Sequence, residues 1–134
     1  MIKFTIPLNP VPKKNNPQIA INPKTKRPFI LPSKKYKEYE NACISLIPRE
    51  ARQNVDYPVN VKAVFYRSTA HRVDKVNLEE ALHDILVKAG VLADDSAISP
   101  TVGVSTDGSR VYLDRKNPRT EVEITEVEYD GSND

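Results

Sequence analysis

The chain has 134 residues, of which 28% are charged and 39% hydrophobic, and its formal net charge is +2. These values are ordinary for a soluble globular protein and predict a single domain over residues 1–134. The sequence shows no signal pattern and no apolar run of the roughly 20 residues that a membrane helix needs. Its single cysteine, Cys43, excludes an intramolecular disulfide. We therefore expect a cytoplasmic protein with no membrane partner.

The first part of the chain predicts a strand, a basic loop and a helix. Met1–Pro7 alternates apolar and polar residues, as a half-buried strand does. Asn9–Pro32 is rich in Pro, Asn and Lys and lacks apolar periodicity, which indicates a long loop or hairpin, usually functional or mobile. Ser33 is a fair N-cap for a helix that runs to about residues 46–47 and places Cys43 on its apolar stripe as a buried thiol.

The middle of the chain predicts a central strand and a second helix. Pro58–Arg67 alternates but has apolar Val64 on its second face, which indicates a strand covered on one side and partly on the other. Asp74 caps the next helix, and Gly90 ends it as a C′ glycine. The apolar stripe of this helix recurs at helical spacing in Leu78, Leu82, Ile85, Leu86 and Ala89. A strand-to-helix junction is a usual place for a ligand site.

The last part of the chain predicts short strands. Ile98–Ser105 would be a short strand, and Thr106–Ser109 holds an Asp-Gly turn signal. Arg110–Leu113 and Thr120–Val127 alternate and would form a closing antiparallel pair, before a polar, frayed tail over residues 129–134. The order β–loop–α–β–α–β–β predicts an α+β domain in which a small mixed sheet carries two helices.

The helix that starts at Asp74 offers several oxygen ligands on one side. At about 100° per residue, Asn77 and Asp84 lie within roughly 20° of each other, with Glu80 about 40° further round. After the next turn, Asp94-Asp95 can come back toward the helix. Mg²⁺ prefers such ligands. A second interpretation stays open, in which Asp74 only caps the helix and the other acids form a solvated face and a turn.

This stretch resembles the signature of the RusA-like Holliday junction resolvases, a family of crossover junction endodeoxyribonucleases. The signature has an Asp and then Asp-Asn at a helix start, followed by Lys-Ala, Asp-hydrophobe-Leu, Ala-Gly and a closing Asp-Asp before a hydrophobe. The matching positions are Asp74, Asn77, Ala81, Asp84-Ile85-Leu86, Ala89-Gly90 and Asp94-Asp95-Ser96-Ala97-Ile98. The chain departs from the family at Val76, where the second acid of the Asp-x-Asp pair stands, and at Glu80, where a catalytic lysine often stands.

The resemblance implies a Mg²⁺- or Mn²⁺-dependent endonuclease that resolves four-way DNA junctions as a C2 homodimer, since a two-fold symmetric junction needs two incisions. Asp74, Asp95 and Glu80 would be the catalytic metal ligands, helped by Asn77, Asp84 or Asp94. The metal would lower the pKa of a bound water and stabilise charge on the cleaved phosphate. The resemblance is also compatible with a phage or prophage origin.

Basic side chains, most of them in the first half of the chain, would hold the DNA. Residues 1–60 have eleven Lys/Arg and four Asp/Glu, net +7, whereas residues 61–134 have nine and fourteen, net −5. Basic and amide side chains position phosphates. Those predicted to contact DNA are Lys13, Lys14, Asn16, Lys24, Lys26, Arg27, Lys34, Lys35, Arg72 and Lys75. Tyr36 is a further candidate, although its place on the apolar stripe favours the core.

Three functions stay open. In the first, Glu80, one helical turn beyond Val76, restores the missing carboxylate of an active junction resolvase. In the second, Val76 makes the site inactive, because it cannot bind a metal. The protein then binds junctions with salt-dependent affinity but forms no metal-dependent cleavage product. In the third, the chain is a small interaction domain that does not bind junctions even at low salt.

Overall fold

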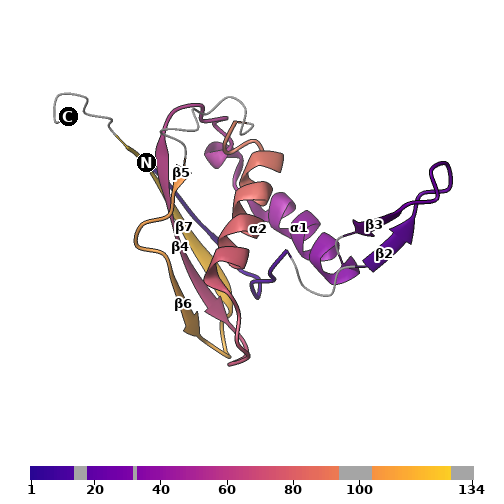
Figure 1. Ribbon diagram of the computed structural model, residues 1–134. Helices are drawn as coiled ribbons and strands as arrows, with labels where there is room; N and C mark the ends of the chain where they lie inside the picture. The colour runs from indigo at the N-terminus through magenta and orange to yellow at the C-terminus, as the bar shows by residue number, and fades with distance from the viewer. Residues whose placement is uncertain (14–17, 32, 94–103, 128–134) are drawn as a thin grey trace, which may run out of the picture.

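A computed structural model of the chain describes residues 1–13, 18–31, 33–93 and 104–127. Two helices lie on one face of a mixed five-stranded sheet, and a separate two-stranded hairpin projects from this body (Figure 1). The predicted α+β class is therefore confirmed. The sheet is made of β1 (Ile2–Ile6), β4 (Val59–Arg67), β5 (Val104–Ser105), β6 (Arg110–Leu113) and β7 (Arg119–Glu126). The other elements are β2 (Gln18–Ile21), β3 (Pro28–Leu31), α1 (Lys34–Leu46), the short 3₁₀ helix η1 (Arg49–Ala51) and α2 (Lys75–Lys88).

Strand β4 is the centre of the sheet, as its sequence predicts. One edge of β4 pairs antiparallel with β7, which in turn pairs antiparallel with β1. The other edge pairs in parallel with β5 at the start of β4 and with β6 at its end. Alternate residues of β4 are buried under the helices, namely Val59, Val61, Ala63 and Phe65. In β1 the same alternation buries Ile2, Phe4 and Ile6, and the residues between them face solvent.

The prediction that Arg110–Leu113 and Thr120–Val127 pair with each other is wrong, because β4 lies between β6 and β7. Strand β6 follows the α2 crossover and joins β4 in parallel, with Arg67 opposite Leu113. The chain then passes the end of β4, where the Asp114 N–H donates to the Arg67 carbonyl at 2.8 Å. It returns as β7 on the other edge of β4. Alternation identifies a strand but does not specify its partner.

Both helices start and end where the sequence predicts. Ser33 Oγ accepts from the Tyr36 N–H of α1 at 3.1 Å, and Asp74 Oδ1 accepts from the Val76 N–H of α2 at 3.0 Å. Gly90 has φ +80°, the left-handed conformation of a C′ glycine. These caps satisfy N–H groups that have no partner within their helix. No described helix is long and apolar enough to cross a membrane.

The core lies between the helices and the buried face of the sheet. The whole predicted stripe of α2 is buried, as is Cys43 of α1. Tyr36 is 1% exposed and packs with Val11 and Ala81, so the core interpretation of Tyr36 is confirmed. Burial of each large apolar side chain contributes about 1.5–3 kcal/mol to stability. The contacts of Val11 also bring the segment after β1 across to both helices.

The predicted loop or hairpin over Asn9–Pro32 is a hairpin in its described part. Strands β2 and β3 pair antiparallel, with Ile21 opposite Pro28. The tip is closed by the Lys26 N–H, which donates to the Asn22 carbonyl at 2.7 Å, while Lys26 itself has φ 56°. The start of the predicted strand at Ile98 and the predicted frayed tail lie outside the described residues.

Candidate active site

Asp74 stands where the connection from β4 enters α2. Its side chain is exposed, and Oδ1 is occupied by the N-cap bond to Val76. Within the described ranges, Asp74 Oδ2 takes part in no hydrogen bond or ion pair. The position therefore combines a fixed carboxylate with an oxygen that faces solvent. A carboxylate of this kind can serve as a cap and as a ligand at once.

The other predicted ligands of α2 lie at increasing distances from Asp74. Asn77 is half-buried about one turn along the helix, and Glu80 is exposed about two turns along. Asp84 is ten residues on, about 15 Å along the axis at 1.5 Å per residue. Its Oδ2 forms an ion pair with Lys13 Nζ. Because Mg²⁺–oxygen distances are about 2.1 Å, Asp74 and Asp84 of one chain cannot share an ion.

The described residues do not complete a metal site by themselves. No three His, Cys, Asp or Glu side chains among them are close enough together to hold an ion. Val76, at the place of the family's second acid, is 51% exposed and offers no ligand atom. Asp94 and Asp95 lie outside the described residues, beyond Ala93, whose N–H bonds the Val55 carbonyl at 2.8 Å. Their assembly with Asp74 stays a prediction.

A hollow of about 290 Å³ lies beside the start of α2 and has a basic lining. Its cations come from three segments: Lys35 from α1, Arg67 from the end of β4, and Arg72 from the connection to α2. The remaining lining residues are Asn9, Pro10, Val11, Pro12, Thr69, His71 and Val73, so that no described acidic side chain lines the hollow. This charge and position suit a phosphate group next to the Asp74 carboxylate.

One wall of the hollow is built from the segment that follows β1. The Asn9 side-chain oxygen accepts from the Ser68 N–H at 2.9 Å and so fixes this segment to the chain that leaves β4. A second hollow of about 280 Å³ lies next to the first and shares Arg67, His71 and Arg72 with it. Asn9 and Arg67 are not among the site residues predicted from the sequence. In the alternating pattern of β4, Arg67 falls on the buried side, where a cation is unexpected. The sequence pattern could therefore have identified it.

Arg67 is half-buried, and its side chain is held by one hydrogen bond. Its Nη1 donates to the His71 carbonyl at 2.6 Å, and burial lowers the pKa of the guanidinium. Its Nε is buried and has no hydrogen-bond partner among the described residues. Lys75, the next cation along the chain, has its Nζ 3.4 Å from the Ser109 carbonyl and 3.8 Å from Glu79 Oε1. It therefore lies against the start of β6 instead of extending freely into solvent.

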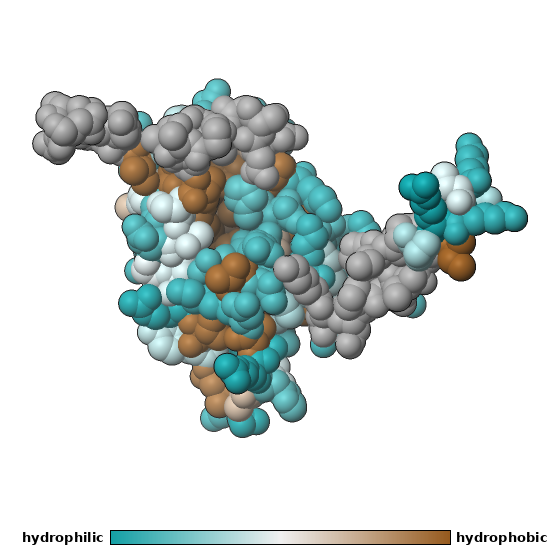
Figure 2. All heavy atoms as spheres, viewed as in Figure 1, coloured by the Kyte–Doolittle hydropathy of each residue, from teal (hydrophilic) through white to brown (hydrophobic). Residues whose placement is uncertain are grey.

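The other predicted DNA contacts are spread along the basic part of the chain. Lys34 and Lys35 are exposed at the start of α1, and Lys13 is engaged by Asp84. Lys24, Lys26 and Arg27 are exposed at the tip of the hairpin, whose outer end is mostly hydrophilic (Figure 2). Lys14 and Asn16 lie outside the described residues.

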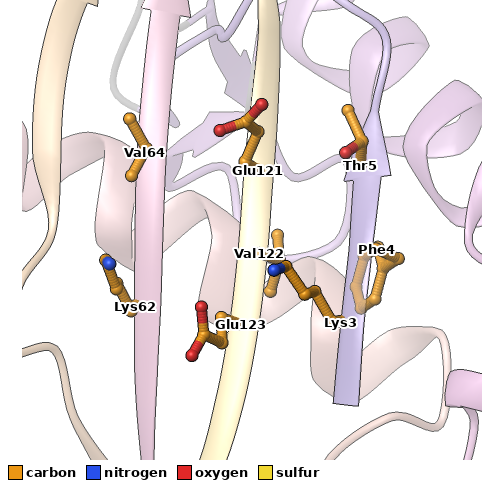
Figure 3. Close-up of a pocket in the computed structure, with 8 residues that line it drawn as sticks. All are labelled: Lys3, Phe4, Thr5, Lys62, Val64, Glu121, Val122 and Glu123. Atoms are coloured by element: carbon orange, nitrogen blue, oxygen red, sulfur yellow. The ribbon is translucent and has the colours of Figure 1, made fainter.

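A larger hollow, of about 510 Å³, lies on the sheet face that the helices leave open (Figure 3). Lys3 of β1 and Lys62 of β4 stand on either side of Glu123 of β7, their partner in the register, and Glu121 lies further along the same strand. Two lysines and two glutamates cancel in charge. This hollow therefore lacks the positive potential that a phosphate backbone requires.

A comparison with protein families identifies the family of this chain. The family model described as Endodeoxyribonuclease RusA matches residues 7–125, which is most of the chain. The matched stretch runs from the end of β1 into β7 and contains every predicted ligand and every predicted DNA contact. A comparison with curated proteins gives no match.

Proposed function

The chain belongs to the RusA family of endodeoxyribonucleases, and we propose that it cleaves four-way DNA junctions with the help of a divalent metal ion. One observation carries the proposal: the exposed Asp74 directly follows Val73, which lines a hollow that has three cations and no acid among the described residues. Hydrolysis of a DNA strand needs carboxylates for the metal and basic side chains for the phosphate. The surroundings of Asp74 are suited to both.

In this proposal Asp74, Asp95 and Glu80 hold the ion, with Asn77 and Asp94 as further oxygen ligands. Asp84 is not part of the set, because of its ion pair with Lys13 and its distance along α2. The ion, Mg²⁺ or Mn²⁺, would activate water and stabilise the charge of the cleaved phosphate. Exposure of Glu80 supports its role, since its carboxylate is free to turn toward the start of the helix.

The cations around Asp74 would orient the DNA backbone. Lys35 and Arg72 line the hollow and would pair with phosphates there, and Lys34 and Lys75 stand at the starts of the two helices. The hairpin cations would reach a more distant part of one duplex arm, which the projection of the hairpin supports (Figure 1). A C2 homodimer would present two such sites to the two strands of a symmetric junction.

A second function is favoured by Val76. An exposed, uncharged residue at the family's acid position leaves the site one carboxylate short, and the basic surface does not depend on it. The protein would then bind branched DNA without cutting it. Both functions predict salt-dependent binding, so only the product separates them.

The deciding experiment incubates the protein with a mobile four-way junction in Mg²⁺, Mn²⁺ or EDTA, beside a linear duplex of the same sequence. Symmetric nicks that need the metal and the junction support the nuclease. Tight junction binding without a cut in either metal supports the binding protein. Absence of both binding and cutting at low salt rejects both functions.

A further inference from the structure

Arg67 is a cation on the buried phase of a strand. The residues that precede it in that phase, Val61, Ala63 and Phe65, are 5%, 1% and 1% exposed. Arg67 forms no ion pair with any carboxylate in the part of the chain that the structure describes. Its Nε–H is buried without an acceptor there, and its single side-chain bond is from Nη1 to the His71 carbonyl.

This arrangement is unfavourable for the protein alone. Partial burial of a guanidinium is unfavourable unless a counter-charge or a full set of hydrogen bonds compensates it. The lowered pKa of Arg67 has burial as its cause. The neighbouring hollow supplies two more cations, Lys35 and Arg72, and no described acid. No described carboxylate neutralises Arg67, and an anion bound in the hollow would supply that charge.

We propose that Arg67 binds a backbone phosphate of the DNA in the hollow of about 290 Å³ beside Asp74. This inference rests on the proposed function, to which it adds a phosphate-binding residue and the hollow in which the phosphate would lie. Because Nη1 donates to the His71 carbonyl, Nε and Nη2 form the fork of donors left for a phosphate, and a rotation of the side chain would uncover Nε, which has almost no exposed surface. Such a fork can donate two parallel hydrogen bonds to two oxygens of one phosphate. Lys35 and Arg72 would add charge to the same group.

The competing explanation is purely structural. In that case Arg67 serves only to hold the connection between β4 and α2 through its bond to His71, and no anion enters the hollow. The two explanations differ in whether the Nε–H responds to phosphate, and in whether the charge of Arg67 affects DNA binding.

The first test follows the Nε–H resonances of ¹⁵N-labelled protein while inorganic pyrophosphate is added. Arg67→Lys assigns the Arg67 resonance, and Arg49, an exposed arginine on η1, is the internal reference. We expect the Arg67 resonance to shift and saturate, whereas the Arg49 resonance shows no saturable change. A resonance of Arg67 that stays in place or follows Arg49 overturns the inference.

The second test measures junction binding in EDTA over a range of salt concentrations. We expect Arg67→Gln to weaken binding about ten-fold and to reduce the slope of log K against log salt by about one, relative to Arg49→Gln. Thr69→Glu brings an acid into the lining while Arg67 stays in place, and should weaken binding without loss of stability, with Thr69→Gln as its control. Equal binding by Arg67→Gln and Arg49→Gln, or by the two Thr69 variants, contradicts the inference.

The outcomes also separate this inference from the proposed function. If the unchanged protein neither binds nor cuts junctions but its Arg67 resonance saturates with pyrophosphate, the anion site stands and the nuclease does not. If the protein cuts junctions and Arg67→Gln cuts and binds as well as Arg49→Gln, the nuclease stands and the phosphate role of Arg67 is rejected.

Discussion

Lys13 forms an ion pair with Asp84 and thereby ties the segment after β1 to the middle of α2. From the sequence, Lys13 is predicted to contact DNA and Asp84 is predicted to bind the metal. Their side chains are 45% and 32% exposed, so the pair is partly screened by water. Together with the contacts of Val11 on Tyr36 and Ala81, it fixes the base of the segment that leads to the hairpin. We therefore expect Asp84 to position this segment and not to bind the metal, in contrast to the prediction from the sequence.

Asp84→Asn tests this assignment. Because a partly exposed pair contributes about 0–1 kcal/mol, we expect the free energy of unfolding in urea to fall by no more than about 1 kcal/mol. Junction cleavage should stay within about two-fold of the unchanged protein, since Asp84 is too far from Asp74 to share its ion. Complete loss of metal-dependent cleavage in a stable Asp84→Asn protein would return Asp84 to the ligand set.

Asp74→Asn separates the two roles of the helix cap. Asn is as good an N-cap as Asp, so α2 and the stability of the protein should be preserved. We expect cleavage of the junction to fall at least about 100-fold, because a charged ligand is lost. Binding in EDTA should be equal or tighter, since a negative charge is removed near the phosphates. Asp95→Asn should behave in the same way, and Asp56→Asn, at an exposed site of the η1–β4 connection, is the control.

If Asp74→Asn and Asp95→Asn lose binding and cleavage together while they remain folded, a separate metal role for these acids is ruled out. Circular dichroism and urea unfolding establish the folded state. The comparison with Asp56→Asn removes any general effect of one less negative charge.

The helices and strands were largely readable from the sequence because their signals are local. Ser33 and Asp74 cap helices where the pattern places them, and the alternation of Pro58–Arg67 identifies the central strand. The pairing of β6 was not readable, since the same alternation fits either edge of a neighbour. The crossover through α2 places β6 parallel to β4, and β7 takes the opposite edge.

Only part of the candidate site could be predicted from the sequence, because its contacts join segments that are distant along the chain. Asp74 was found from a local motif, whereas the pair of Lys13 with Asp84 spans 71 positions of the chain. The hollow beside Asp74 collects Asn9, Lys35 and Arg67, which no spacing rule connects. A cation in the buried phase of a strand is a local signal, and Arg67 could have been found from it.

Neutralising the hairpin tip tests its role on DNA. The variant Lys24→Gln/Lys26→Gln/Arg27→Gln removes three exposed charges from a part of the chain that projects from the core. We expect unchanged stability, weaker junction binding, and a salt slope reduced by up to about three. The control Lys3→Gln/Lys62→Gln removes charges from the open sheet face, where they are balanced by Glu121 and Glu123. A salt slope that is the same in both variants and in the unchanged protein would show that the tip does not contact phosphates.

Alkaline pH should weaken the fold through the buried groups of α1. Burial raises the pKa of Cys43 to about 11 and raises those of Tyr36 and Tyr39 above their ordinary range. Above the ordinary pKa of a thiol, the unfolded chain releases protons that the native protein still holds, so stability falls as pH rises. We expect the free energy of unfolding in urea to decrease between about pH 9 and 11, and less steeply in Cys43→Ala. A flat profile in the unchanged protein would contradict this.

Val76→Asp tests whether one missing acid limits the site. Val76 is 51% exposed in the first turn of α2, where a negative charge is favourable, so the substitution should not reduce stability. We expect it to increase metal-dependent cleavage of the junction about ten-fold or more, because it restores the family's Asp-x-Asp pair with Asp74. Val127→Asp adds the same charge at another exposed valine and should leave the rate unchanged. Equal rates for the two variants and for an active unchanged protein would mean that Glu80 fully replaces the missing acid. Absence of cleavage by all three proteins would mean that Val76 is not what prevents cutting.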